Sequence, residues 1–554
     1  MENLIAAFHE IANIHTLALM SIGAMAGLLA GAIPGFTIAM AVVLTLPFTF
    51  SMTASQGVAT MIGVFVGGLS GGLMSGILIG IPGTPSSVAT TFDGFPMARQ
   101  GRPGLALGLG VWASFFGGTI SAISLIAIAP QLARIGLEFQ PWDYFALVFF
   151  ALTITASLAG ENLIKGLISG ALGLLIATVG EEDINGVSRF DFGSDYLQEG
   201  FAFLPVLIGL FAFSQLMSDV RDRAEAKRSL AQTGDIDIRI EHMKAAKIVL
   251  SKWGNLLRSS FIGIFTGILP AAGSSISNIL AYDQAKKASK HPEFFGTGIE
   301  DGIIAPEAAN NATAGGSLIM MMALGIPGDI ITAVMLGALL IHDVIPSPSF
   351  ITESPVLAYS IFIAFFFANF LVLFLQSIAL KLFVLVTRVK MYVLAGIILA
   401  YCGIGVFALN NIVNDMWTLL IFGVVGYVMR NLGFPLAPMI LGVVLGPIAE
   451  RWLARAVAIS TDMTNFITHP WSVFFLTLSL FSMAFGLYQR DLNKKVWPLY
   501  YSPVLMLCLS PGMFMMEGWI RPVIGAALVA AGLYGLYRAR QKAAVFEPSS
   551  GASA

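Results

Sequence analysis

Long apolar runs separated by short polar segments recur along the chain from Ile22 to its C-terminal end. Many runs reach about 20 residues, the length that a helix needs to cross the hydrocarbon core of a bilayer. The strict alternation of apolar and polar positions that a membrane barrel needs is not visible. The pattern predicts an all-α polytopic membrane protein with about 12 to 16 helical passes and hairpins.

Composition agrees with this pattern. Of the 554 residues, 56% are hydrophobic and 11% are charged, against roughly 25% charged residues in a soluble domain. The formal net charge is −2 and no long basic run occurs, so nucleic acid is not an expected partner. The expected surroundings of this chain are a lipid bilayer.

The positions of lysine and arginine predict which side each loop faces. The first basic residue is Arg99, whereas the long polar stretch from Arg221 to Arg258 carries nine Lys and Arg residues. Basic loops stay in the cytoplasm by the positive-inside rule. The N-terminus is therefore expected outside, and the second half of the chain is expected to start from inside.

The two halves resemble each other around proline and glycine. LLAGAIPGFT from Leu28 is similar to FTGILPAAGS from Phe265, and GIPGTPSSVAT from Gly80 is similar to GIPGDIITAVM from Gly325. The offset is 236 residues between Pro34 and Pro270 and 245 residues between Pro82 and Pro327. Two similar halves that enter the membrane from opposite sides are typical of secondary transporters, which bind substrate where paired helices are broken.

The repeat predicts an inverted-repeat secondary transporter with broken helices and re-entrant hairpins. We expect hairpin tips near Pro270 and at Pro34 to Gly35, while residues 58–99 form either one interrupted span or a second hairpin. The expected domains are a first transmembrane repeat at 1–218, a cytoplasmic polar loop at 219–252, a second repeat at 253–489, an extra C-terminal helical hairpin at 490–542 and a disordered tail at 543–554.

The breaks carry the predicted substrate chemistry. Where a helix restarts, free backbone N–H groups and the positive end of the helix dipole attract an anion. Nearby hydroxyl and amide groups add side-chain donors. The predicted substrate-binding residues are Pro34, Gly35, Thr37, Gly83, Thr84, Pro85, Ser86, Ser87, Ser274, Ser275, Asn278, Pro327 and Gly328. Close helix packing is the alternative explanation for small hydroxyl residues in membrane helices.

Carbonyl, hydroxyl and amide oxygens near the breaks suit a hard cation such as Na⁺. The predicted cation-binding residues are Asn310, Asn311, Thr313 and Asp329. Acidic residues within the membrane are costly and therefore point to function, which makes Asp93 and Glu307 further candidates for cation or proton coupling. Asp283 and Asp343 also qualify, although both are expected to be paired or solvated charges near the interface.

Enzyme chemistry is not indicated. No Gly-Lys dipeptide occurs, so the chain has no Walker A loop. The His9-Glu10 pair lacks a second histidine at the spacing that zinc hydrolases use. We expect no catalytic residues, no cofactor and no metal beyond a coupling Na⁺; H⁺ is the other candidate coupling ion.

Three long motifs resemble one transporter family. IPGTPSSVATTFDGFPMARQGRPGLALG, GEEDINGVSRFDFGSDYLQEG and IIAPEAANNATAGGSLIMMMALGIPGD follow one another in the chain. They resemble the large permease subunit of the tripartite tricarboxylate transporters, over about Leu19 to Phe485, and LGPIAERWLARAVAIS fits the same pattern. The hairpin from Val496 to Leu536 lies beyond this likeness and is a candidate to dock or replace the small subunit.

The resemblance implies a multi-pass carrier of the bacterial inner membrane. Such a carrier takes a carboxylate from a periplasmic substrate-binding protein, works with a small four-helix membrane subunit and is driven by a Na⁺ or H⁺ gradient in an elevator-like movement. It also implies that Pro82 to Ser86 lie at one break, and that Asn310 and Asn311 precede the other break, which contains Pro327 and Gly328. Asp329 departs from the family pattern, since small residues are expected at this position. An acid beside an anion site would repel an anionic substrate.

Two other functions stay open on the sequence. A cation/proton antiporter without an organic substrate would also have intramembrane carboxylates and inverted repeats. The membrane subunit of an ATP-driven importer need not contain the ATPase itself.

Overall fold

A computed structural model describes residues 2–33, 36–158, 163–182, 186–221, 239–270, 273–342, 344–386, 391–492, 494–516 and 518–544. The predicted tip residues Pro34 and Gly35, Asp343, and most of the predicted polar loop and tail lie outside these residues. The chain forms two compact units, one of Met1–Leu137 with Phe201–Leu432 and the other of Glu138–Gly200 with Gly433–Ala554. The predicted repeat boundaries divide the chain by internal similarity instead, and they stay a prediction.

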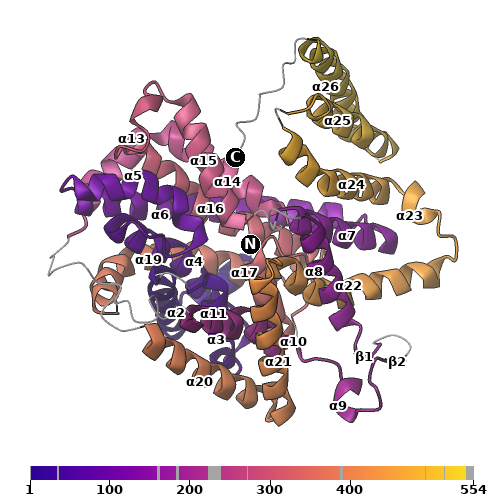
Figure 1. The fold of residues 1–554 in the computed structure, drawn as a ribbon, viewed down its shortest axis with the longest axis horizontal. Coiled ribbons are helices and arrows are strands. Elements are labelled where there is room, and N and C mark those ends of the chain that lie inside the picture. The colour runs from indigo at the N-terminus through magenta and orange to yellow at the C-terminus, as the bar shows by residue number, and fades with distance from the viewer. Residues whose placement is uncertain are drawn as a thin grey trace. The chain divides into compact units, whose positions relative to one another are not determined.

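The described residues are almost entirely helical, which confirms the all-α polytopic prediction (Figure 1). Among them, seven helices are long and apolar enough to cross a membrane. Shorter apolar helices occur beside them, including the second arms that follow the helix breaks. The seven long helices are Ile14–Ala32, Ala54–Ile79, Pro103–Gly136, Pro355–Phe383, Leu436–Ile459, Pro470–Tyr488 and Ile520–Ala543.

The first unit begins with a helical series that contains the first two predicted breaks. Its elements are α1 (Glu2–Ile11), α2 (Ile14–Ala32), α3 (Ile38–Thr49), α4 (Ala54–Ile79), the 3-10 turn η1 (Pro85–Ser87), α5 (Val88–Arg99) and α6 (Pro103–Gly136).

A second series repeats this order. It comprises α13 (His242–Ser251), α14 (Trp253–Ile268), α15 (Gly273–Ala288), the turn η3 (Pro292–Phe294), α16 (Asp301–Leu324), α17 (Ile330–Ile341), α18 (Phe350–Glu353) and α19 (Pro355–Val386). The unit is completed by α10 (Phe203–Ile208), the π-helical η2 (Gly209–Phe213), α11 (Ser214–Arg221), α20 (Met391–Asn410) and α21 (Val413–Asn431).

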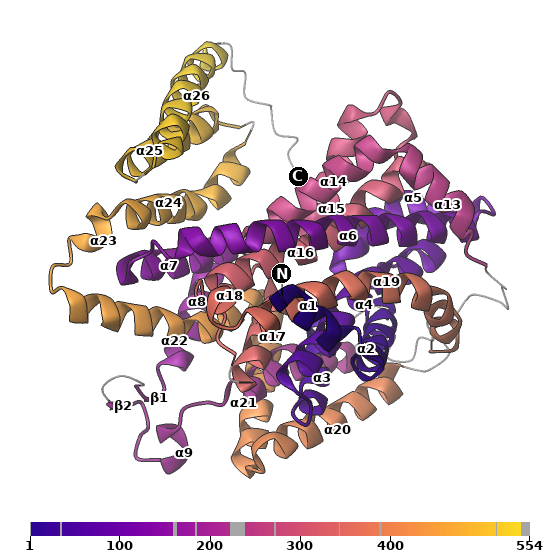
Figure 2. The ribbon, with the colours of Figure 1, turned by 180° about the vertical axis from the view of Figure 1, so that it is seen from behind.

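The two series pack in a matching way. Within the first series α2 packs on α4, and within the second α14 packs on α16. Between the series the partners are exchanged: α1 packs on α19 and α13 on α6, while α3 packs on α17 and α15 on α5. Such exchanged contacts are the arrangement that two similar halves related by a twofold axis produce. Figure 2 shows α14, α15 and α16 side by side.

Glycine allows the closest of these contacts, between α2 and α4. A Cβ atom on Gly27 would lie 2.2 Å from the carbonyl oxygen of Val64, and one on Gly67 would lie 2.3 Å from the carbonyl oxygen of Ala24. The α14 to α16 contact repeats this, because a Cβ on Gly263 would lie 2.3 Å from the carbonyl oxygen of Ala309. Small residues that let backbones touch are the usual basis of helix association in membranes.

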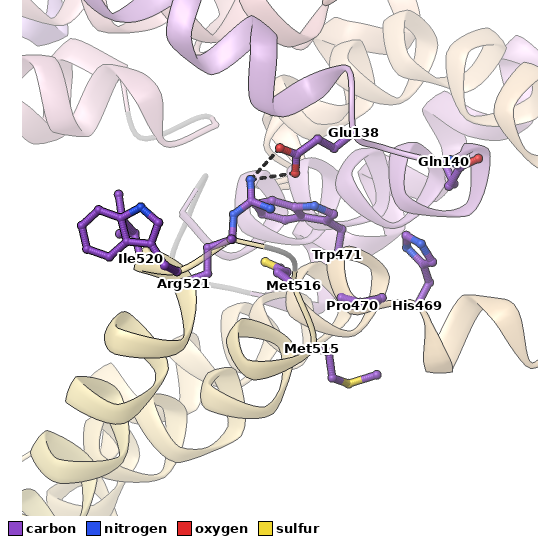
Figure 3. A pocket seen from close by; sticks show the side chains of 11 residues that line it. Glu138, Gln140, His469, Pro470, Trp471, Met515, Met516, Ile520 and Arg521 are labelled. Atoms are coloured by element: carbon purple, nitrogen blue, oxygen red, sulfur yellow. Dashed lines mark hydrogen bonds and ion pairs between the residues drawn. The ribbon is translucent and has the colours of Figure 1, made fainter.

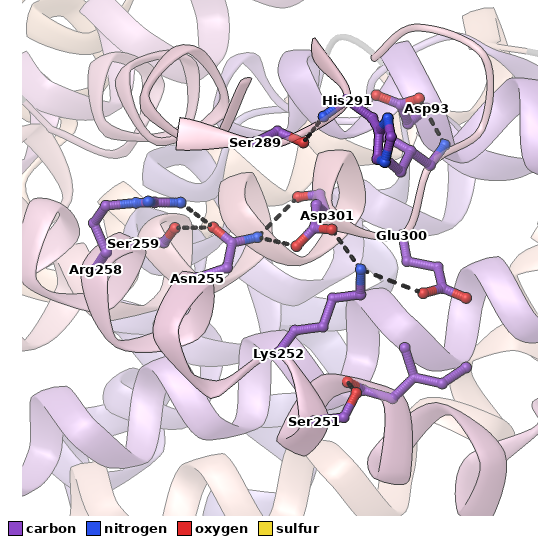
Figure 4. A network of polar contacts seen from close by, with 12 residues as sticks. Asp93, Ser251, Lys252, Asn255, Arg258, Ser259, Ser289, His291, Glu300 and Asp301 are labelled. Carbon is purple, nitrogen blue, oxygen red and sulfur yellow. Dashed lines mark hydrogen bonds and ion pairs between the residues drawn. The ribbon is translucent and has the colours of Figure 1, made fainter. Parts of the chain in front are cut away.

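Charged groups tie the beginning of α14 to the beginning of α16 (Figure 4). Lys252 Nζ lies 2.5 Å from Asp301 Oδ2 and 3.7 Å from Glu300. The amide of Asn255 donates to Asp301 Oδ1 at 2.9 Å and accepts from Arg258. These residues hold the two helices of the second series together at the end where the chain enters them.

The second unit contains α7 (Pro141–Leu158), α8 (Leu163–Ala177), α9 (Asp195–Gln198), α22 (Leu436–Ile459), α23 (Asn465–Thr468), α24 (Pro470–Asp491), α25 (Pro498–Met515) and α26 (Ile520–Ala543). It also contains a two-stranded antiparallel pair, β1 (Gly180–Glu181) and β2 (Ser188–Arg189). Helices α25 and α26 pack on each other.

A pocket of about 830 Å³ lies in this unit where the α25–α26 connection meets the start of α24 (Figure 3). Arg521 donates to Glu138 at 2.7 Å, and its guanidinium lies 5.5 Å from the ring centroid of Trp471. His469 Nδ1 lies 2.7 Å from Oδ1 of the buried Asp143. These contacts join α24 to the C-terminal hairpin within one unit.

Candidate functional site

The stretch after Gly80 breaks a membrane helix, as predicted. Gly80 has a φ of 71°, which ends α4 in the left-handed conformation that glycine adopts easily. Thr84 then caps the next turn, since its backbone N–H bonds Ser87 Oγ at 3.4 Å and its carbonyl accepts from the same hydroxyl at 2.9 Å. Ser86 Oγ lies 2.9 Å from Thr84 Oγ1. The hydroxyl groups therefore satisfy the backbone that the break frees.

The chain doubles back inside this break and then continues in its first direction. A Cβ on Gly72 would lie 2.7 Å from Ser87 Oγ, whereas one on Gly80 would lie 3.0 Å from the ring of Phe95. Helix α5 therefore runs beside the last turns of α4 and in the same direction. From Gly80 back to Gly72 is about 12 Å of helix. The helix α4 is long enough to span the membrane by itself, and α5 lies beside its last turns in the same direction, so residues 58–99 form neither an in-line interrupted span nor an antiparallel hairpin.

The second break is built in the same way. Gly325 ends α16 with a φ of 73°, and the chain returns until a Cβ on Gly328 would lie 2.6 Å from the Cα of Ser317. Asp329 then caps α17, because its Oδ1 accepts from the backbone N–H of Thr332 at 2.7 Å. Its Oδ2 accepts from Ser317 at 3.0 Å. Asp329 therefore has the capping role that Thr84 has in the first series.

The first arm of each hairpin ends against the following break of the same series. A Cβ on Gly83 would lie 2.1 Å from the carbonyl oxygen of Gly31, near the end of α2. At the matching position, a Cβ on Gly328 would lie 2.3 Å from the carbonyl oxygen of Gly267, near the end of α14. These close approaches explain why glycine stands at both positions. They also bring the two breaks of each series together.

One side chain joins the breaks of the two series. The amide nitrogen of Asn278, on α15, donates to the backbone carbonyl of Ser86 in the first break. The preceding residue of α15, Ser277, contacts another element: its Oγ lies 2.7 Å from Thr313 Oγ1 on α16. The first turn of α15 also comes close to the second break, since a Cβ on Gly273 would lie 3.7 Å from the Cβ of Asp329.

The predicted substrate residues separate into groups in the structure. Thr84, Ser86, Ser87, Ser274 and Asn278 are buried where η1 packs on α15, while Pro85 and Ser275 are exposed beside them. Pro327 and Gly328 are buried at the second break. Thr37 caps its own helix, accepting from the backbone N–H of Met40 at 3.2 Å. Pro34 and Gly35 lie outside the described residues.

The predicted cation residues lie along the middle of α16. The Asn310 amide donates to the carbonyl of Leu69 at 3.0 Å, and its Oδ1 is buried without a hydrogen-bond partner. The Oδ1 of Asn311 already accepts from Ser70 at 2.9 Å. Thr313 donates to the carbonyl of Ala309 at 2.7 Å. Asp329 lies farther along, with Ser317 and Thr332, so these four residues do not surround a single point through contacts that we observe.

The buried carboxylate of Glu307 lies among helices of both series. Its Oε1 accepts from Thr90 on α5 at 2.6 Å, and its Oε2 accepts from Ser114 on α6 at 2.8 Å. In the described part of the chain no Lys, Arg or His pairs with it. A buried carboxylate without a basic partner needs a proton or a bound cation to balance its charge. Glu307 is therefore the acidic candidate with the strongest structural case.

Asp93 has a different environment. One of its carboxylate oxygens accepts from the backbone N–H groups of Gly296, Gly298 and Ile299 at 2.8–2.9 Å, and the other accepts from Tyr282 at 2.9 Å. It holds the connection before α16 against α5, which is a structural role. Asp283 pairs with Lys287 at 2.5 Å on an exposed surface, and Asp343 lies outside the described residues.

Several polar residues near Glu307 were not selected from the sequence. They are Ser70, Thr90, Ser114, Asn369 and Gln376. All are buried. Gln376 follows Asn369 by seven positions, or about two helical turns, in the otherwise apolar run from Phe365 to Gln376. Two amides on one face of such a helix are a signal that the sequence does contain.

In the second unit, the motif GEEDINGVSRFDFGSDYLQEG contacts the motif LGPIAERWLARAVAIS. Arg189 forms a two-point contact with Glu450: Nη1 contacts Oε1, and Nη2 donates to Oε2 at 3.0 Å. The hydrogen bond to Glu450 raises the pKa of Arg189. Each side chain is 29% exposed. The contact fixes the β1–β2 pair to α22.

Comparisons with known proteins give one consistent relationship. A family model described as the tripartite tricarboxylate transporter TctA family matches residues 17–441. An uncharacterized 52.8 kDa protein in the TAR-I ttuC' 3' region of Agrobacterium vitis is 32% identical over 416 residues, covering 75% of this chain and 82% of that protein. A second uncharacterized protein, in the TAR-II ttuC' 3' region of the same organism, is 34% identical over 234 residues, which is 42% of this chain and 97% of that protein. No solved structure matches significantly.

Proposed function

Because the chain belongs to the tripartite tricarboxylate transporter TctA family, we propose that it imports tricarboxylates or related carboxylates across a bacterial inner membrane. In this proposal a periplasmic substrate-binding protein delivers the carboxylate, and a small four-helix membrane subunit completes the transporter. A Na⁺ or H⁺ gradient drives an elevator-like movement. No catalytic residue or cofactor takes part.

The contact between the first helix break, at Ser86, and Asn278 on α15 of the second series carries this proposal. The restarting helices direct N–H groups and dipole ends at one region, and the hydroxyls of Thr84, Ser86 and Ser87 add donors. A carboxylate can accept hydrogen bonds from such groups without a buried arginine. In this proposal the substrate reaches these donors from the side on which Ser275 and Pro85 are exposed.

For the coupling ion, Asn310, Asn311, Thr313 and Asp329 stay the predicted ligands. The unpartnered Oδ1 of Asn310 supports an occupant near that residue, because a buried acceptor without a donor is costly. The carboxylate of Asp329 is committed to Thr332 and Ser317. That commitment explains how an acid is tolerated beside an anion site.

The test is uptake of labelled citrate into proteoliposomes that contain this chain and its small subunit. The cognate binding protein is added outside, with and without an inward Na⁺ gradient. The expected result is uptake that needs both the binding protein and the gradient. Uptake that ignores both would overturn the tripartite mechanism. Activity on a dicarboxylate or aromatic acid but not citrate would change the substrate alone.

A second candidate function is cation/proton exchange without an organic substrate. The observation that favours it is Glu307, a buried carboxylate with hydroxyl partners and no basic partner in the described residues. Ion exchange in vesicles that lack both carboxylate and binding protein would support this function over import.

A further inference from the structure

A small enclosed cavity lies between α4, α6 and α19, away from the helix breaks. Its polar wall consists of Ser70, Ser114, Asn369 and Gln376, and the rest of the wall is apolar, with Val111 and Phe115 among it. The four polar residues are at most 3% exposed. The cavity has room for about one water-sized occupant. No charged residue lines it.

Each of the four polar residues of this cavity donates one hydrogen bond to another group of the protein. Ser70 Oγ donates to Asn311 Oδ1 at 2.9 Å, and Ser114 Oγ donates to Glu307 Oε2 at 2.8 Å. The amide nitrogen of Asn369 donates to the carbonyl of Phe365 at 2.7 Å, and that of Gln376 to the carbonyl of Ser70 at 3.3 Å. The oxygen atoms of all four side chains keep lone pairs that a bound cation can use.

One of these oxygens has no partner. Gln376 is 1% exposed, and its Oε1 is a buried acceptor that receives no hydrogen bond. Leaving such an acceptor unsatisfied costs about 1–3 kcal/mol. An occupant that carries positive charge or donates a proton would remove this cost.

Negative charge lies directly behind the wall. Ser114 is hydrogen-bonded to Glu307, whose carboxylate has no Lys, Arg or His partner in the described part of the chain. The hydroxyl of Ser114 donates to that carboxylate, and the hydroxyl of Ser70 donates to Asn311. Donating a hydrogen bond makes each hydroxyl oxygen more electron-rich on the side that faces the cavity. A cation in the cavity can therefore balance the charge of Glu307, with only the side chain of Ser114 between them.

We propose that this cavity binds one dehydrated Na⁺ ion, coordinated by oxygens of Ser70, Ser114, Asn369 and Gln376 and balanced by Glu307. Hydroxyl and amide oxygens are the ligands that hard monovalent and divalent cations take in proteins. The cavity's size favours Na⁺ over the larger K⁺. Its role as a coupling ion rests on the proposed transport function, whereas its binding does not. The site differs from the predicted group at Asn310, Asn311, Thr313 and Asp329.

The site would also explain the packing around it. An ion here bridges α4, α6 and α19, and through Ser70 and Ser114 it reaches Asn311 and Glu307 on α16. Occupancy therefore bears on how the long helices of the two series contact each other. This is a position from which an ion can affect the helix break that follows α4.

The test uses the purified full chain in lipid nanodiscs, with no substrate and no partner protein. Thermal stability is measured in Na⁺, K⁺ and choline chloride at equal ionic strength, and binding of radioactive Na⁺ is measured directly. A ligand that binds only the folded state raises its stability with concentration. We expect Na⁺ to raise the melting temperature above that in K⁺ or choline.

The variants Gln376→Leu and Ser114→Ala should each weaken Na⁺ binding by about tenfold or more, because each removes one oxygen ligand. Gln376→Glu keeps an oxygen and should retain binding. Ser121→Ala is the matched control, since Ser121 is a buried serine on the same helix α6 that donates to the carbonyl of Gly118. It should bind Na⁺ as the unchanged chain does.

Equal effects of Na⁺ and choline on the unchanged chain would overturn the site. So would wild-type Na⁺ binding in both Gln376→Leu and Ser114→Ala. If Gln376→Leu does not fold, Ser114→Ala against Ser121→Ala decides. If the unchanged chain takes up citrate but shows no Na⁺ response in this assay, the site alone is wrong. If the unchanged chain binds Na⁺ but takes up no carboxylate, the proposed function alone is wrong.

Discussion

The side-chain amide of Asn278 donates to the backbone carbonyl of Ser86, although the two residues are 192 positions apart. Ser86 lies in the break after α4, and Asn278 lies on α15, the second arm of the α14–α15 hairpin. The bond connects a break of one series to a hairpin of the other. It joins the proposed substrate region to both halves of the chain.

Replacing Asn278 with alanine should lower carboxylate uptake by about tenfold, because an unsatisfied buried carbonyl at Ser86 would reposition the η1 turn. The measurement is citrate uptake in proteoliposomes, with melting temperature as the check on folding. Asn13→Ala serves as the control, since Asn13 caps α2 through the backbone N–H of Thr16. Normal uptake in Asn278→Ala would show that the hydrogen bond from Asn278 to Ser86 is not needed for transport.

The hydroxyl pair beside this bond should contribute to substrate binding directly. Ser86 and Ser87 are buried, and both contact Thr84. We expect Ser86→Ala combined with Ser87→Ala to weaken uptake, mainly through a raised KM, while the protein stays folded. The matched control is Ser260→Ala, a buried serine that donates only within its own helix in the contacts observed, to Leu256. Wild-type kinetics in the double variant would argue against a hydroxyl site.

The helix breaks could be predicted from the sequence because proline and glycine act locally. Gly80 and Gly325 end their helices in the left-handed conformation, and the repeated Gly-Ile-Pro-Gly made both positions visible. The capping role of Asp329 could be predicted in part, since Asp329 and Thr332 have the same spacing as Thr84 and Ser87. That spacing indicates a cap, which the composition of the motif alone did not suggest.

The contacts across the chain could not be predicted in the same way. The doubling back of residues 80–87 depends on Gly83 meeting Gly31, and no local signal encodes a contact between distant turns. The polar set around Glu307 comes from four helices, α4, α5, α6 and α19. Single hydroxyls in apolar helices usually serve packing, so Ser70 and Ser114 carried no distinguishing signal before the fold placed them together.

The α2–α4 seam should tolerate no side chain at Gly67. A Cβ there would meet the carbonyl oxygen of Ala24 at 2.3 Å, so Gly67→Ala should cost about 1–3 kcal/mol of stability through overpacking. Gly254→Ala is the control, because nothing lies within 4 Å of its added Cβ and alanine is the better helix former. Melting temperatures in detergent compare the two, and equal values would contradict the tight seam.

The pairing of Arg189 with Glu450 should depend on the shape of the guanidinium. Lysine keeps the charge but cannot make two parallel hydrogen bonds to one carboxylate, so Arg189→Lys should loosen the β1–β2 pair from α22. Because both side chains are partly exposed, we expect a loss of only about 1 kcal/mol. Protease cleavage between Gly180 and Gly200 would detect it, and Lys244→Arg, in an exposed ion pair with Glu241, should leave cleavage unchanged.

Two substitutions of Asp329 distinguish its role as the N-cap of α17 from the role of its negative charge. Thr84 has the equivalent place in the first series, so Asp329→Thr should keep the N-cap of α17 and nearly the full melting temperature. Asp329→Ala should lose the cap, at a cost of about 1 kcal/mol. If Asp329 also contributes to cation binding, both variants should shift the Na⁺ dependence of uptake, and only the alanine variant should lose stability. A threonine variant with unchanged Na⁺ dependence would limit Asp329 to its capping role, because the carboxylate would then be dispensable for coupling.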